Sequence, residues 1–193
     1  MERNNVMYRT MQSALTTRDG ESNEAPVIEG YFAVFDSNYD MGYGMSESVA
    51  PGAFSETLAG DVRALIDHDT RLVLGRTTAH TLELREDSHG LWGKIYINPK
   101  DSEAMNLYER VKRGDVSQCS FGFEILSEET TFPAGGEIHW RITKVKLYEV
   151  SCCTYPAYEE TGISARKKDR EQIEKRKSEA WKSALLKKLK GEK

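Results

Sequence analysis

The sequence contains little cysteine and little histidine: three and four residues respectively among 193. Three cysteines, two of them adjacent (Cys152 and Cys153), cannot form the disulfide framework of a small secreted protein. The cysteines and histidines also lack the C-x-x-C or H-x-x-x-H spacing of a structural zinc site. We therefore expect no metal and no other cofactor, and cysteines that serve as small core residues in a reducing compartment.

Long apolar runs are missing as well. No stretch approaches the ~18 residues that a membrane-spanning helix needs. The first residues, Met1-Glu-Arg-Asn-Asn, lack the apolar region of a signal peptide. The length suits one domain, whose body of roughly 150 residues would bury about 70% of its unfolded surface without a disulfide or metal. These absences predict a soluble protein with a single core.

Short runs rich in β-branched and aromatic residues, bounded by Gly, Asp, Asn and Ser, predict a strand-dominated body. The predicted strands are residues 30–35, 61–68, 81–85, 91–97, 116–126 and 138–153, the last as more than one strand. In 61–68 the period of two places Val62, Ala64, Ile66 and His68 on one face. Asp87-Ser-His-Gly90 is typical of a hairpin turn.

Two helices are predicted inside this body: a short helical turn at 55–58, after Pro51-Gly-Ala-Phe54, and a longer helix at 102–113. Asp101 or Ser102 can cap the N-terminus of the longer helix, and Gly114 suits the position just after its C-terminus. Between them, one face of the helix is apolar, with Ala104, Leu107, Tyr108 and Val111.

The charge is unevenly distributed. The formal net charge is −4, yet residues 165–193 hold 12 basic and 5 acidic residues, which leaves 15 basic and 26 acidic residues in 1–164. Apolar residues at helical spacing, such as Trp181 and Leu185, make 165–193 a basic amphipathic helix. We expect a flexible segment at 1–26, a body at 27–164 and this tail.

The tail has three interpretations: docking on an acidic partner helix, a solvated helix of no special role, or contact with nucleic acid. Its apolar stripe favours a protein partner.

Ser120 is the candidate nucleophile, in Gln118-Cys-Ser-Phe-Gly122 within an apolar run. Gln118 stands where a G-x-S-x-G elbow needs glycine, so that motif does not apply. A serine in a strand is most often structural. Gly122 nevertheless lets backbone or substrate approach closely.

His68, between Asp67 and Asp69, is the candidate base, with the other three histidines, His80, His89 and His139, as competitors. Glu149 is a carboxylate between apolar strand residues, where it would need a partner if buried. It is the candidate for the group that holds the imidazole. Adjacent strand residues point to opposite faces, so Asp67 and Asp69 are badly aimed for that role. A solvent-facing Glu149 on an edge strand remains the alternative.

Taken together, these segments resemble the HK97-like prohead (capsid maturation) protease family of tailed bacteriophages. The matching segments, in chain order, are Gly30-Tyr-Phe-Ala-Val-Phe35, Pro51-Gly-Ala-Phe54, Ala64-Leu-Ile-Asp-His-Asp69, Leu74-Gly75, Gly90-Leu91, Ser120-Phe-Gly-Phe123, Leu147-Tyr-Glu-Val-Ser151 and Tyr155-Pro-Ala157. They cover roughly residues 27–165. Cys119 and the pair Cys152-Cys153 depart from the pattern, because those places usually hold apolar residues; we expect small buried thiols there and no catalytic role.

The resemblance implies a fold and an activity. The fold would be mostly β with helices (α+β), an antiparallel β-barrel similar to herpesvirus assemblin with helices packed outside. The activity would be that of a serine endopeptidase with His68 and Ser120 and, as the acidic third member, Glu149. Herpesvirus enzymes use a second histidine in that place, so His139 stays open.

The resemblance also implies where the protein acts and on what. It would pass from the host cytoplasm into the prohead, cut the scaffold protein or the scaffold-like arm of the capsid protein, and cut itself. The basic tail would dock on scaffold, and neither nucleic acid nor membrane is an expected partner. The main alternative is an inactive capsid-assembly or scaffold protein with a protease-like body. A metallohydrolase that uses His68 with Asp67 or Asp69 would lack further ligands at suitable spacing.

Overall fold

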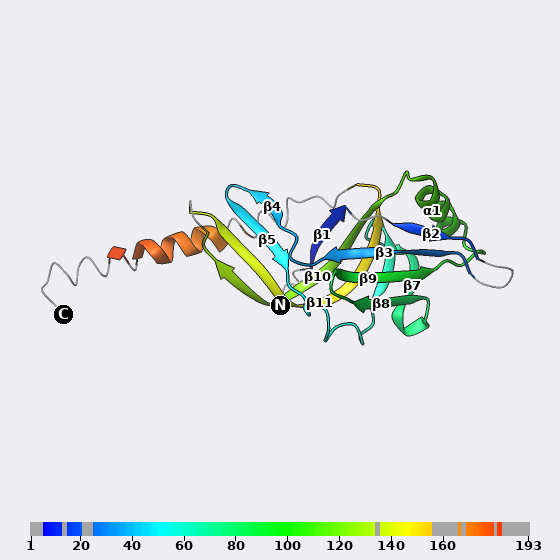
Figure 1. Cartoon of the computed structure of the whole chain (residues 1–193), viewed down its shortest axis with the longest axis horizontal. Helices are drawn as coiled ribbons and strands as arrows, with labels where there is room; N and C mark the ends of the chain where they lie inside the picture. Colours follow the sequence, from blue (N-terminus) through cyan, green and yellow to red (C-terminus); the bar gives the residue numbers. More distant parts are fainter. Residues whose placement is uncertain are drawn as a thin grey trace, which may run out of the picture. The chain divides into compact units, whose positions relative to one another are not determined.

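The structure is a computed structural model that describes residues 6–12, 15–20, 25–133, 136–155, 166, 169–179 and 181–182 (Figure 1). The chain divides into two compact units, 1–159 and 160–193. In the second unit the described residues, 166, 169–179 and 181–182, are helical, and the rest of the predicted tail helix, Leu185 included, lies outside the described residues. No helix among the described residues is long and apolar enough to cross a membrane.

The larger sheet is built around two long strands, β10 (Gln118–Thr131) and β11 (Ile138–Cys153), which pair with each other in antiparallel fashion. Its order is β1-β10-β11-β5-β4, with β1 (Met7–Gln12), β5 (Met45–Val49) and β4 (Tyr39–Gly42). The other edge of β11 is shared. The first half of β11 pairs with β5 and the last residues of β11 pair with β6 (Arg63–Ile66), both in parallel. β6 in turn pairs in antiparallel fashion with β7 (Asp69–Arg76).

The smaller sheet is antiparallel, with the order β2-β3-β9-β8. Its strands are β2 (Thr16–Arg18), β3 (Val27–Val34), β9 (Gly90–Tyr96) and β8 (Leu82–Glu86). The β8–β9 hairpin turns at 87–89, as the sequence predicts. A short 3-10 helix, Thr77–Ala79, precedes β8.

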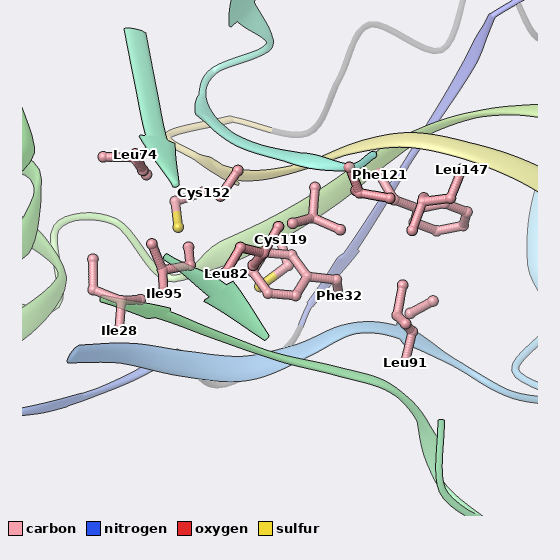
Figure 2. Close-up of a cluster of buried hydrophobic side chains, with 14 of the residues drawn as sticks. Ile28, Phe32, Leu74, Leu82, Leu91, Ile95, Cys119, Phe121, Leu147 and Cys152 are labelled. Atoms are coloured by element: carbon pink, nitrogen blue, oxygen red, sulfur yellow. The ribbon is translucent and has the colours of Figure 1, made fainter. Parts of the chain in front are cut away.

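The two sheets share one core (Figure 2). Phe32 and Ile95 come from the smaller sheet and Phe121 and Cys152 from the larger one, and all four are fully buried. Burying a large apolar side chain stabilises the folded state by about 1.5–3 kcal/mol. This shared cluster therefore holds the larger sheet against the smaller one. Only one face of β10 and β11 packs in this core.

The longer predicted helix is confirmed as α1 (Ser102–Arg113). The Asp101 side chain accepts hydrogen bonds from the backbone N–H groups of Glu103 and Ala104. Gly114 ends the helix with a φ of 90°, a conformation that glycine adopts without strain. The four apolar residues of its predicted face are all buried.

The predicted class, mostly β with helices, is confirmed, but the strands do not close into a barrel. Among the described residues β1 and β4 end one sheet and β2 and β8 end the other, whereas a closed barrel has no edge strands. Residues 138–153 form one strand instead of several, because β5 and β6 pair with successive parts of its edge and the irregular pairing with β10 near Phe123 and Ser127 does not interrupt it.

Two further expectations about local structure are wrong. The strand predicted for 61–68 ends at Ile66, and His68 lies in the turn that follows, away from the core face of Val62, Ala64 and Ile66. Within the segment 1–26, taken as flexible, residues 7–12 and 16–18 are strands β1 and β2. Their apolar content is low, and they are ordered by pairing: β1 pairs with β10, which is distant in sequence, and β2 pairs with β3.

Candidate active site

His68 is positioned by a strained two-residue turn. Ile66 pairs with Asp69, so Asp67 and His68 alone connect β6 to β7. Their φ angles are 48° and 62°, as a type I′ hairpin turn requires, and non-glycine residues in that region carry a conformational cost of about 1–3 kcal/mol each. Two contacts offset it: Asp67 accepts a hydrogen bond from the Thr154 backbone N–H at 2.8 Å, and the His68 N–H donates to Ser151 Oγ at 3.3 Å.

Glu149 lies against this histidine. Val150 and Cys152 point into the core, so strand alternation places Glu149, Ser151 and Cys153 on the opposite face of β11. Glu149 Oε1 is 2.8 Å from His68 Nδ1, and Oε2 accepts a hydrogen bond from Ser151 Oγ at 2.5 Å.

The Glu149 carboxylate is well placed to orient the imidazole. It is only 7% exposed, and a buried carboxylate needs such partners to stay charged. A carboxylate can only accept a hydrogen bond, so Nδ1 carries the proton and Nε2 is left as the basic nitrogen.

Ser120 lies on the same face of the sheet, one strand away. It pairs with Ser151 in the β10–β11 register, so their side chains share a face. Ser120 has no exposed surface, and its hydroxyl donates a hydrogen bond to the backbone carbonyl of Arg9 at 3.0 Å. The structure therefore brings Ser120 to the His68–Glu149 face but directs its single proton to β1 and not to His68.

Gly122 provides the space in which these groups meet. A Cβ at this position would lie 2.4 Å from Glu149 Oε1 and 2.9 Å from Tyr8 Cε1. Without a side chain there, the Tyr8 ring reaches from β1 across β10 to His68, with 4.4 Å between ring centroids. Desolvation, and secondarily the Glu149 carboxylate, raise the pKa of Tyr8. The phenol therefore stays uncharged beside His68.

Cys153 is the unexpected neighbour of the base. The thiol is buried, as the sequence predicts, but it lies on the site face of β11, where its Sγ is 3.7 Å from His68 Nε2. Burial raises the pKa of this thiol, and the carboxylates of Asp67 and Glu149 add to the effect. A thiol that holds its proton is a poor nucleophile.

The structure separates the competing histidines from this site. His139 contacts Ser46 Oγ and Ser48 Oγ through its two ring nitrogens, at 2.8 and 3.0 Å. It is ten residues before Glu149 on the same strand, a distance of about 33 Å in extended backbone. His80 follows the 3-10 helix, and His89 packs against Tyr31. His139 therefore does not take part in the His68 site.

Sequence reasoning missed three residues that contact His68. Ser151 and Cys153 follow Glu149 at the strand period of two, a signal that could have found them. No local signal could have found Tyr8, because it reaches His68 only through the pairing of β1 with β10. Within the described ranges no three His, Cys, Asp or Glu side chains gather as metal ligands would.

Comparison with known proteins decides the family. Residues 13–176 match the family described as caudovirus prohead serine protease. The chain belongs to this family. A relative, the prohead protease of Enterobacteria phage HK97, is 32% identical over 155 residues, which are 78% of this chain and 63% of that protein. The match thus spans less than two thirds of the HK97 protein. No solved structure matches the chain. Strand β1 lies just before the segment that matches the prohead serine protease family.

Proposed function

We propose that this chain is a serine endopeptidase of capsid maturation, with Ser120 as nucleophile, His68 as base and Glu149 as the group that orients the base. The observation that carries the proposal is the 2.8 Å contact between His68 Nδ1 and the buried Glu149 carboxylate, on the face of the sheet that also holds Ser120. These residues are far apart in sequence, and the family is one of serine proteases.

The proposed reaction is acyl transfer from a peptide bond to Ser120. His68 Nε2 takes the hydroxyl proton as Oγ attacks the carbonyl carbon, and then gives it to the amine that leaves. Water, activated by the same nitrogen, releases the acyl group. Glu149 holds Nδ1–H and offsets the charge of the imidazolium that forms. Backbone N–H groups would hold the oxyanion, with about 3 kcal/mol for one good donor.

The family supports capsid proteins as substrates. The relative from phage HK97 is a prohead protease, and we infer that this chain acts inside the prohead on the scaffold protein or the scaffold-like arm of the capsid protein, and on itself. The basic helix in 165–193 would dock on an acidic partner helix of the scaffold. These substrates and the docking are proposals.

The test is co-expression of the chain with the scaffold and capsid proteins of its own phage. Mass spectrometry of the assemblies would compare the original chain with Ser120→Ala and, as the matched control, Ser117→Ala. We expect cleaved products with the original and the control, and intact proteins with Ser120→Ala. Processing by Ser120→Ala would overturn the assignment of the nucleophile.

One observation favours the alternative of an inactive assembly protein: Ser120 is fully buried and hydrogen-bonded to Arg9. A fluorophosphonate probe, which reacts only with an activated serine, separates the two. Labelling at Ser120 supports the enzyme. Absence of labelling in assemblies that mature normally would support the assembly protein.

A further inference from the structure

Strand β1 covers the proposed nucleophile. It is the edge strand beside β10 (Figure 1). The two strands pair in antiparallel fashion over Met7–Gln12, with Thr10 directly opposite Ser120. Ser120 has no exposed surface in this arrangement, and Tyr8 lies against the His68 ring. No peptide could reach the Ser120 hydroxyl while β1 keeps this place.

The arrangement is that of a bound strand in an unreactive geometry. A peptide commonly binds a sheet by adding a strand to its edge, and a protease substrate must bring one carbonyl group to the nucleophile. The Arg9 carbonyl is the group at Ser120, but its oxygen accepts the Ser120 proton at 3.0 Å. The proton is therefore held away from His68, so the hydroxyl is not activated for attack.

A buried ion pair fastens β1 to the body. The Arg9 guanidinium contacts both carboxylate oxygens of Glu47, at 2.6 and 3.0 Å, and the two residues are 7% and 2% exposed. The rings of Tyr39 and Phe123 lie 5.8 and 5.9 Å from the guanidinium carbon. A pocket of about 430 Å³, lined among others by Arg9 and Glu47, adjoins the pair.

The Glu47 carboxylate also limits what can replace β1. A buried carboxylate that loses its cation is strongly destabilising, because its charge is then left uncompensated in surroundings less polar than water. A strand that displaces β1 keeps the site stable only if it brings a positive side chain to Glu47. The same buried residue would thus secure β1 and select the peptide that takes its place.

We propose that the edge of β10 is the substrate-binding edge, that β1 occupies it as an inhibitory strand, and that Glu47 selects a basic side chain in the substrate. This inference rests on the proposed function. Its first test measures access to position 120, which does not depend on activity.

The first experiment uses the full chain with Ser120→Cys and measures alkylation at position 120 by iodoacetamide, with mass spectrometry. Adding Arg9→Glu, which places two carboxylates together, should raise the rate at least tenfold. The swap Arg9→Glu with Glu47→Arg should return it toward the starting rate. Arg113→Glu, which removes an exposed ion pair with Asp115, is the matched control and should change nothing. Equal rates with and without Arg9→Glu would overturn the occlusion.

The buried cysteines report on folding in the same experiment. Cys119 and Cys152 are fully buried in the core, so their alkylation would show that a variant has unfolded. In that case Arg9→Gln, which removes the charge without adding one, replaces Arg9→Glu. An unchanged rate at position 120 in folded Arg9→Gln would count against the proposal equally.

The second experiment tests whether Glu47 selects substrates with a basic side chain. The full chain with Arg9→Gln is given a peptide library, and the cleavage sites are identified by mass spectrometry. We expect Arg and Lys to be enriched at one position relative to the cut, and the enrichment to be lost when Glu47→Gln is added. Cleavage without basic enrichment would overturn the role of Glu47. If alkylation responds as expected but no variant cleaves peptides, the proposed function fails while the occlusion by β1 stands.

Discussion

The two faces of the β10–β11 pair differ in chemistry, although alternate residues of the same two strands form them. On one face Cys119, Phe121 and Cys152 are fully buried in the shared core (Figure 2). On the other, Ser120 and Glu149 lie where His68 and β1 cover them. Adjacent residues thus have separate tasks, because the strand period of two sends their side chains in opposite directions.

Because the two faces are separate, the site can hold polar groups without weakening the core. The core face supplies stability through apolar burial, while the site face satisfies its polar atoms through hydrogen bonds within β11, between β10 and β1, and from the β6–β7 turn. Substitutions on the two faces should therefore have different effects, one on activity and the other on stability.

The largest expected effect is that of Ser120→Ala on the site face. Activity, once measured as kcat/KM on a cleaved peptide, should fall by a factor on the order of 10⁶, by analogy with loss of the subtilisin nucleophile. Stability should change by only about 1 kcal/mol, because one hydrogen bond to Arg9 is lost. Urea unfolding measures the second quantity.

The neighbour Cys119→Ala is the matched control, since its thiol lies in the core. It should lower stability and leave kcat/KM nearly unchanged. A loss of activity equal in both variants would contradict the separation of the two faces.

Glu149→Gln should lower kcat by about 10⁴, the size of the effect of the equivalent carboxylate-to-amide change in chymotrypsin-type proteases. The amide can present its NH₂ group to Nδ1 and so favour the wrong tautomer of His68. The loss should be smaller than that of His68→Ala. Steady-state kinetics on the same peptide measures both, and a Glu149→Gln variant with full activity would remove this residue from the mechanism.

Phe121→Ala tests the core face. The side chain stacks on Phe123 at 4.7 Å and meets Phe54 edge-on at 5.5 Å. Its removal should cost about 3–5 kcal/mol of unfolding free energy, through lost burial and the cavity that remains. Urea unfolding gives the value, and in the fraction that stays folded kcat/KM should lie near that of the original chain. A cost below 1 kcal/mol would mean that the core face is not tightly packed.

The sequence allowed much of this to be predicted where the signal is local. The caps of α1 at Asp101 and Gly114 and the turn at Asp87–Gly90 depend on neighbouring residues, and the structure agrees with them. The candidates His68, Ser120 and Glu149 came from residue types and from the family resemblance, and they lie on one face.

What the sequence could not show depends on distant pairing. β1 is ordered by β10, more than a hundred residues later, and His68 leaves its strand because Asp67 and His68 adopt left-handed backbone to close a turn. β11 remains one strand because β5 and β6 share its edge in succession. These are tertiary effects that override the local pattern.

Cys153→Ala should have the smallest effect on kcat/KM. It tests whether a residue on the site face can be without a catalytic role. Its thiol is near His68 Nε2, but burial raises its pKa, so it stays protonated at pH 8 and offers no thiolate for attack. We expect kcat/KM within about threefold of the original, and no iodoacetamide adduct at Cys153 after exposure at pH 8, as judged by mass spectrometry. Because a raised pKa delays deprotonation, alkylation should begin only at a more alkaline pH than for an ordinary cysteine. If Cys153→Ala removed activity while Ser120→Ala kept it, the nucleophile would be Cys153, and the site would use the same face and the same base with a different strand.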